Sequence, residues 1–154
     1  MNIRSLEPSD CDTLYQMDRK CFPPAVAFPR RVFEYCLTSE NCLGLGIEKD
    51  ERLIGFIIAQ ATGHFTATIL TLEVEQEFRG QGIATTLLRE MEKLLRTAGF
   101  RLLTLQVQQT NKPALALYRK LGYHNEKILR DYYGKNKNAV HMEKSLAART
   151  SRKR

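Results

Sequence analysis

The sequence predicts an α/β fold, in which a mixed and mostly antiparallel sheet of about six or seven strands carries helices on both faces. Two observations carry this prediction. Strand-like and helix-like segments alternate along the 154 residues in the order βααββ(β)αβαββ. Residues 83–98 have the spacing of apolar side chains that is typical of a long amphipathic helix.

The N-terminal third predicts one strand and two helices. Residues 2–6 form the strand, and Ser9 with Asp12 three residues later has the pattern of a capping box that begins a helix. A loop that contains three prolines follows. Because proline is tolerated in the first turn of a helix, a second helix is expected over residues 30–37.

The middle of the chain predicts a hairpin, a strand and the longest helix. Residues 42–60 read as two strands joined by the polar turn "EKDER", and residues 65–74 as the next strand. In the helix over 83–98, Gly99 is placed to end it. Its apolar side chains are expected to form one buried stripe, made of Ile83, Leu87, Leu88, Met91, Leu94, Leu95 and Ala98.

The C-terminal part predicts three further strands and a short helix. The strands are expected over residues 101–107, 123–130 and 139–146. The helix over 111–122 has Asn111 as its N-cap and a proline in its first turn, both common at helix starts.

Composition indicates one domain with a charged end. Residues 1–146 are expected to form a single domain, and residues 147–154 a basic, disordered tail. The net charge is +7, and the tail supplies four of these charges, which leaves +3 (7 − 4) on the body. A basic tail suits a ribosome or nucleic-acid surface, and a merely solubilising end is the alternative. A polar N-terminus without a long apolar run predicts a cytoplasmic protein with no membrane partner. We also expect a monomer or a weak dimer.

The cysteines predict no metal site. The four of them form no C-x-x-C pair, and only three histidines are present. A zinc site needs more closely clustered ligands. We therefore expect free thiols at Cys11, Cys21, Cys36 and Cys42.

The stretch "RGQGIA", residues 79–84, places two glycines between a strand and a long helix. A helix N-terminus presents unpaired N–H groups that suit an anion, and glycine lets the anion approach the main chain. A Walker A loop would need a lysine that is absent, and a dinucleotide fingerprint would need a carboxylate near residues 100–102. A plain tight turn remains an alternative.

The surrounding residues resemble one family. Arg79-x-x-Gly82-x-Ala84 is similar to the Q/R-x-x-G-x-G/A motif of the GNAT superfamily of N-acetyltransferases. Asn111, Ala114 and Tyr118 match the next strand–helix motif of that family. "LRDYYG" and the following strand resemble the RimI-type enzymes, which acetylate protein N-termini such as that of a ribosomal protein. The resemblance covers about residues 2–146 and implies the GNAT fold.

The resemblance implies acetyl-CoA as co-substrate, without a metal. The pyrophosphate would lie on the amides of Arg79, Gly80, Gln81, Gly82, Ile83 and Ala84, and the pantetheine arm along the main chain of Leu72, Glu73 and Val74. Asn111 would lie near that arm, a role compatible with N-capping its helix.

The resemblance also assigns the reacting groups. Tyr118 matches the general acid that protonates the departing thiolate, and packing in the core is its alternative role. The general base is where this chain departs from the family, because the usual carboxylate or histidine is replaced by Gln106. The second base position falls on Thr68, and His64 would reach the site only if its hairpin curled inward. The Glu73 side chain should point away from its neighbours, toward solvent or a covering helix.

The missing base favours a particular acceptor. An α-amine has a pKa of about 7.7–8.0 against about 10.4 for lysine, so the cost of lacking a strong base is about 3 kcal/mol smaller for an N-terminus. Tyr132 and Tyr133 match a tyrosine pair that frames the acceptor, or cover a strand end. Lys135 and Lys137 replace acidic residues of the RimI type, which disfavours a strongly basic acceptor. The alternatives are acetylation of lysine or of a small-molecule amine, and a CoA-binding, ribosome-associated module with little turnover.

Overall fold

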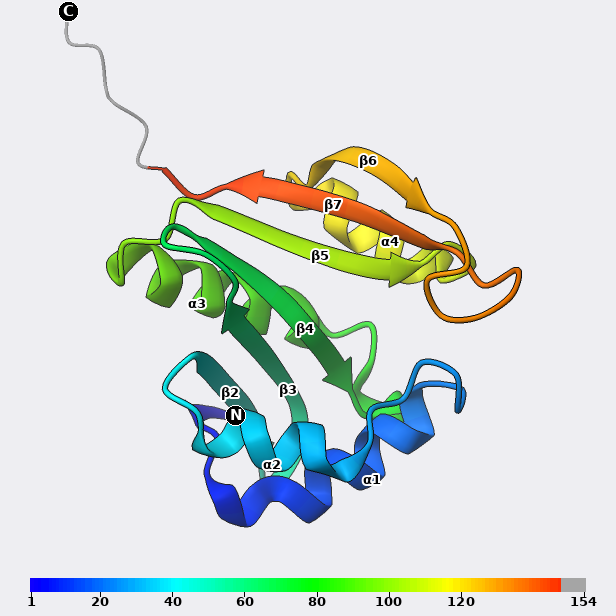
Figure 1. Ribbon diagram of the computed structural model, residues 1–154. Helices are drawn as coiled ribbons and strands as arrows, with labels where there is room; N and C mark the ends of the chain where they lie inside the picture. Colours follow the sequence, from blue (N-terminus) through cyan, green and yellow to red (C-terminus); the bar gives the residue numbers. More distant parts are fainter. Residues whose placement is uncertain (148–154) are drawn as a thin grey trace, which may run out of the picture.

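The computed structural model describes residues 1–147, so the predicted tail lies almost entirely outside the described residues. One seven-stranded sheet runs in the order β1-β2-β3-β4-β5-β7-β6 (Figure 1). The strands are β1 (Asn2–Ser5), β2 (Cys42–Lys49), β3 (Arg52–Ala61), β4 (Thr66–Val74), β5 (Leu102–Gln108), β6 (His124–Leu129) and β7 (Ala139–Ser145). The helices are α1 (Cys11–Cys21), α2 (Arg30–Thr38), α3 (Ile83–Thr97) and α4 (Lys112–Lys120). The predicted α/β class with a mostly antiparallel sheet is confirmed.

Helices cover the two faces of the sheet unequally. On one face α3 and α4 pack over most of the sheet and form the larger core, with Leu87, Leu88 and Met91 fully buried. On the other face α1 and α2 cover only β2, β3 and β4, around Phe33 and Phe56. Figure 1 shows that β5, β7 and β6 have no helix on this second face. The polar side chains of these three strands therefore face outward there.

The strands β4 and β5 separate toward their carboxyl ends. They are the only parallel pair described in the sheet, and their pairing runs from Thr66 with Leu102 to Ile69 with Leu105. Beyond that point the two strands diverge (Figure 1). The backbone groups of Leu72–Val74 that face β5 consequently have no strand partner, and a space opens between the strands.

Local details confirm the predicted cap of α4 and correct the predicted start of α1. Asn111 caps α4 by accepting the Ala114 N–H at 3.3 Å, as predicted. The capping box predicted at Ser9 and Asp12 is wrong: a 3-10 turn over Pro8–Asp10 precedes α1, and Glu7 pairs with Asp10 instead. Asp10 is preferred because it also accepts two hydrogen bonds from Arg4, each 2.8 Å long.

The stripe predicted on α3 is confirmed except at its C-terminal end. Leu94 is 42% exposed and Ala98 is exposed as well, whereas Leu95 between them is buried. Gly99 ends the helix with a φ of 95°. None of the helices among residues 1–147 is long and apolar enough to cross a membrane.

Candidate active site

A cavity of about 700 Å³ lies between the diverging ends of β4 and β5 and the N-terminus of α3. Its volume falls in the range of small-molecule sites in proteins. The structure brings nearly all of the predicted co-substrate residues to this cavity. They are Leu72, Glu73, Val74, Arg79, Gly80, Gly82, Ile83, Ala84 and Asn111, while Gln81 projects from the loop without lining it.

The first turn of α3 presents free donors to this cavity. Gly80 and Gly82 have φ angles of 78° and 81°, a left-handed conformation that favours glycine. Gly82 is the N-cap of α3, and no side chain caps the helix. A Cβ at either glycine would meet no atom within 4 Å, so open space lies in front of the loop. Uncapped N–H groups beside open space fit a phosphate group.

The edge of β4 forms the second wall. Because pairing with β5 ends at Ile69, the main chain of Leu72–Val74 faces the cavity rather than another strand. The guanidinium of Arg79 lies beside this wall, and its Nε donates to the carbonyl oxygen of Val74 at 3.0 Å. An extended ligand lying beside β4 would therefore find unpaired backbone groups, as an added strand does.

Behind this wall lies a buried pair of carboxyl groups, Asp18 on α1 and Glu73 on β4. They are 0% and 3% exposed, and Asp18 Oδ1 and Glu73 Oε1 have no hydrogen-bond partner among the described residues. Burial raises the pKa of both groups, that of Glu73 to about 10. Because Asp18 contributes to the shift at Glu73, we expect the two carboxyl groups to hold one proton between them. Glu73 is thus covered by a helix, one of the two orientations predicted.

Tyr118 lies where this cavity meets a smaller one of about 70 Å³. Its ring is buried against Tyr123, with ring centroids 5.6 Å apart. Tyr123 is held in turn by Glu92 on α3, which accepts its hydroxyl at 2.7 Å. Burial raises the pKa of Tyr118, so the phenol keeps its proton at neutral pH.

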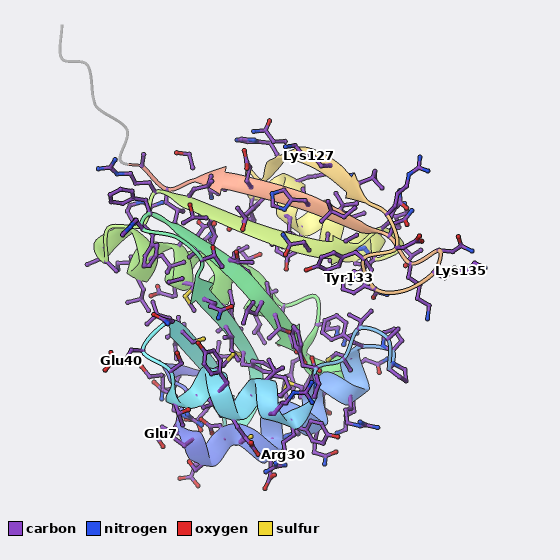
Figure 2. The ribbon with its side chains drawn as sticks, in the orientation of Figure 1. Glu7, Arg30, Glu40, Lys127, Tyr133 and Lys135 are labelled. Atoms are coloured by element: carbon purple, nitrogen blue, oxygen red, sulfur yellow. The ribbon has the colours of Figure 1, made fainter. Side chains whose placement is uncertain are left out.

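The smaller cavity holds the remaining predicted site residues except Tyr132. Gln106 and Tyr133 line it together with Tyr118. Figure 2 shows Tyr133 on the inner side of the β6–β7 loop and Lys135 at its outer end. Burial raises the pKa of Tyr133 to about 12. Tyr132 is 53% exposed and contacts the Tyr133 ring edge-on, outside the cavity.

The two alternative base positions lie away from both cavities. The Thr68 hydroxyl bonds Thr104 at 2.8 Å and Thr62 at 3.2 Å, on the uncovered face of the sheet. His64 is exposed in the turn before β4. Along the described chain, the titratable side chains that line the smaller cavity are therefore the two tyrosines.

Comparison with known proteins decides the family. The model of the acetyltransferase (GNAT) family matches residues 11–123. This chain belongs to the GNAT acetyltransferase family. The ribosomal protein bS18-alanine N-acetyltransferase of Salmonella typhimurium is 31% identical over 133 residues, which cover 85% of this chain and 86% of the relative.

Solved structures of GNAT proteins share the fold over nearly the whole length. The Escherichia coli ribosomal-protein-S18-alanine N-acetyltransferase superposes with a TM-score of 0.85 at 25% identity, and covers 99% of this chain and 98% of its own. An aminoglycoside 6'-N-acetyltransferase in complex with coenzyme A gives a TM-score of 0.85 at 20% identity, and covers 98% of this chain and 100% of its own. The predicted family and the enzyme class, an acyltransferase, are confirmed.

Several residues of this GNAT site were missed by the sequence analysis. Cys21 on α1 lines the cavity, with Asp18 buried behind it, and the Arg79 Nη2 lies 3.4 Å from the Cys21 sulfur. Burial raises the pKa of the Cys21 thiol to about 11, so this thiol is no ready nucleophile. His141 on β7 hydrogen-bonds Gln106, with 2.8 Å between Nδ1 and Nε2. Only the pairing of β5 with β7 reveals this contact, and the sequence carries no local signal for it.

The described part of the chain shows no cluster of metal ligands. No group of three metal-ligating side chains is found among residues 1–147. All four cysteines are free thiols, of which Cys11, Cys36 and Cys42 are buried and Cys21 is half-buried.

Proposed function

We infer that the protein transfers the acetyl group of acetyl-CoA directly to the α-amine of a protein or peptide N-terminus. The family supports the acetyl transfer. The relatives named as ribosomal protein bS18-alanine N-acetyltransferases support an N-terminal acceptor. The structural neighbour that binds coenzyme A supports the co-substrate.

The larger cavity is the proposed site of acetyl-CoA. The amides at the start of α3 would hold the pyrophosphate, and the free edge of β4 at Leu72–Val74 would hold the pantetheine arm. Asn111 lines both cavities and lies near the far end of that arm. When bound, acetyl-CoA supplies a thioester, whose C–S bond breaks as the amine nitrogen forms its bond to the acetyl carbon.

Tyr118 is the proposed general acid. Its hydroxyl has no hydrogen-bond partner among the described residues and faces the junction of the cavities, so it is free to donate to the departing sulfur. Because burial holds its pKa high, the phenol is always protonated at working pH. The phenol gives its proton to the sulfur and regains one from solvent, while the acceptor nitrogen loses its own proton to water.

The acceptor is inferred from what lines the smaller cavity. Among residues 1–147, no carboxylate or imidazole lines it, so the amine must arrive largely neutral. At neutral pH an α-amine is neutral to a substantial fraction, whereas lysine is neutral at roughly one part in a thousand. The junction of the two cavities at Tyr118, without a strong base beside it, is the observation on which this proposal depends.

The experiment compares two peptides of one sequence. The first has a free α-amine and no lysine, and the second has an acetylated α-amine and one lysine. We expect release of the CoA thiol and a mass gain of one acetyl group with the first peptide only. A library that varies the first two residues then defines the acceptor. Transfer to no free α-amine in that library would refute the proposal.

The same assay decides between the alternatives. Transfer only to lysine or to a small-molecule amine would place the protein closer to its aminoglycoside-acetylating neighbour. Tight acetyl-CoA binding without transfer to any amine would indicate a binding module. A cytoplasmic location, a monomeric or weakly dimeric state and a ribosome contact through the tail remain predictions, and the tail itself lies outside the described residues.

A further inference from the structure

Gln106 and His141 face each other on adjacent strands of the uncovered face. They are direct partners in the antiparallel pairing of β5 with β7. The Gln106 side-chain nitrogen Nε2 lies 2.8 Å from His141 Nδ1. An amide nitrogen only donates, so in this arrangement Nδ1 must accept, which requires a neutral imidazole with its proton on Nε2.

This contact determines which end of the Gln106 amide faces the smaller cavity. Its nitrogen is held by His141, and no described residue donates to its oxygen Oε1. Gln106 lines the smaller cavity whereas His141 does not. An amine attacks through its lone pair, so an acceptor that holds one of its N–H groups orients the lone pair toward the thioester. With neutral His141, Gln106 offers such an acceptor.

Protonation of His141 reverses this arrangement. A proton on Nδ1 would face the Gln106 NH₂ group, and two donors cannot bond each other. A turn of the amide by about 180° restores the hydrogen bond by bringing Oε1 to the imidazolium. The NH₂ group then faces the cavity, where it donates to the amine lone pair and blocks attack.

We propose that His141 is a positioning residue that sets the orientation of the Gln106 amide, so that acetyl transfer requires neutral His141. This inference rests on the proposed function, because it concerns the amine acceptor of the same site. Histidine suits such a role because it changes charge between pH 5 and 8.

Two charges and one phenol surround the pair on this face. Lys127 on β6 is the direct strand partner of His141, and Figure 2 shows it on that outer strand. Glu143, two residues along β7, faces the same way and accepts a hydrogen bond of 2.7 Å from Asn125. Tyr133 approaches from the β6–β7 loop. A cation and an anion therefore flank the imidazole, and neither is hydrogen-bonded to it.

The first test compares His141→Asn with His141→Leu over a range of pH, using a peptide with a free α-amine and saturating acetyl-CoA. In wild type, two ionisations, of the amine and of His141, should give log(kcat/KM) a limiting slope of about 2 at low pH. Asparagine keeps an acceptor for Gln106 without titrating, so we expect wild-type activity near pH 8.5 and a slope of about 1. Leucine removes the acceptor, so we expect about a tenfold loss near pH 8.5.

Controls exclude loss of folding. His64→Asn, at an exposed histidine far from both cavities, should leave the profile unchanged. Thermal unfolding and the Kd of acetyl-CoA should be the same in all variants. An unchanged slope in His141→Asn, or full activity of His141→Leu near pH 8.5, would overturn the proposal.

A second measurement needs no turnover and so separates this proposal from the proposed function. In the NMR spectrum of the full chain, the Gln106 side-chain amide should shift with the same midpoint as the His141 ring. The shift should vanish in His141→Asn. If the wild-type protein acetylates no α-amine, the proposed function fails. If the chemical shift of the Gln106 amide does not change as His141 titrates, this inference fails.

Discussion

The two cavities meet at Tyr118 but are built in different ways. The larger one is formed mainly by one continuous segment, from the end of β4 through the glycine loop into α3. The smaller one collects residues from five separate parts of the chain, among them Phe22, Gln106, Tyr118 and Tyr133. The first includes the free backbone groups at the start of α3 and along β4, and the second brings together Gln106 and the two tyrosines.

This difference determines how substitutions affect the ligand that each cavity binds. Backbone N–H groups at a helix start persist under most substitutions, so a site made from them keeps its ligand. A site made from side chains changes its chemistry with each replacement. The loss of a base at Gln106 therefore leaves the proposed acetyl-CoA site intact and alters only the acceptor side.

The largest expected effect comes from Tyr118, which belongs to both cavities. Tyr118→Phe should lower kcat by about 100-fold or more, because general acid catalysis contributes 10²–10⁴-fold. The Kd of acetyl-CoA should stay within about twofold, because the ring and its packing remain. Steady-state kinetics and a binding titration measure the two effects.

Tyr123→Phe is the matched control for that change. Its hydroxyl bonds buried Glu92 rather than a cavity. Its loss should cost about 1–3 kcal/mol of unfolding free energy, because a buried acceptor loses its donor. Turnover should fall much less than in Tyr118→Phe. Equal turnover of Tyr118→Phe and wild type would make Tyr118 a packing residue.

A substitution at Gly82 tests whether acetyl-CoA binding in the larger cavity depends on the backbone of the glycine loop. Gly82→Ala adds a Cβ at a left-handed position in front of the proposed pyrophosphate site, so the Kd of acetyl-CoA should rise about tenfold or more. Gly99→Ala is matched to it: its φ is also positive, at 95°, and its Cβ would also meet no atom within 4 Å. Both variants should lose about 1 kcal/mol of stability. Equal weakening of binding by both would contradict a site at Gly82.

The features that were predicted from sequence act on their own neighbours in the chain. Gly80 and Gly82 shape the loop they lie in, and Asn111 caps the helix that follows it. Such signals are local, because the residues that interact are also close together in the sequence. For the same reason the core stripe of α3 was predicted up to its last turn.

The missed features depend on contacts between distant segments. His141 meets Gln106 only because β7 inserts between β5 and β6. Asp18 meets Glu73 only because α1 packs on β4. The predicted capping box failed at Ser9 for a related reason, since Arg4 on β1 selects Asp10. No spacing in the sequence encodes these partners.

The buried acid pair gives the next largest effect, on stability. A carboxyl whose pKa is raised on folding stabilises the protein fully below its unfolded pKa, near 4.5, and this contribution is lost as pH rises toward its folded pKa, about 10 for Glu73. The free energy of unfolding should therefore fall with pH in this window, by up to about 1.4 kcal/mol per pH unit. Urea unfolding at several pH values measures this slope.

The variants Glu73→Gln and Asp18→Asn distinguish one proton shared by the two carboxyl groups from two groups that titrate independently. Each variant should flatten the slope, and the double variant should be no flatter than either single one, because one proton is lost in each case. Additive flattening would show that Asp18 and Glu73 titrate separately.

The smallest effect is expected at the β6–β7 loop, which brings Tyr133 to the smaller cavity and carries Lys135 and Lys137 exposed. Replacing both with glutamate should shift the acceptor preference by a few-fold in kcat/KM, toward peptides with basic second and third residues, because exposed charges act weakly through water. The shift should fade at high salt. Lys93→Glu, on the exposed side of α3, removes the same kind of charge far from this loop and should leave the preference unchanged. An equal shift from Lys93→Glu would mean that the net charge of the protein, rather than the β6–β7 loop, steers the acceptor peptide. The acceptor site would then lie elsewhere than on the uncovered face of β5 and β7.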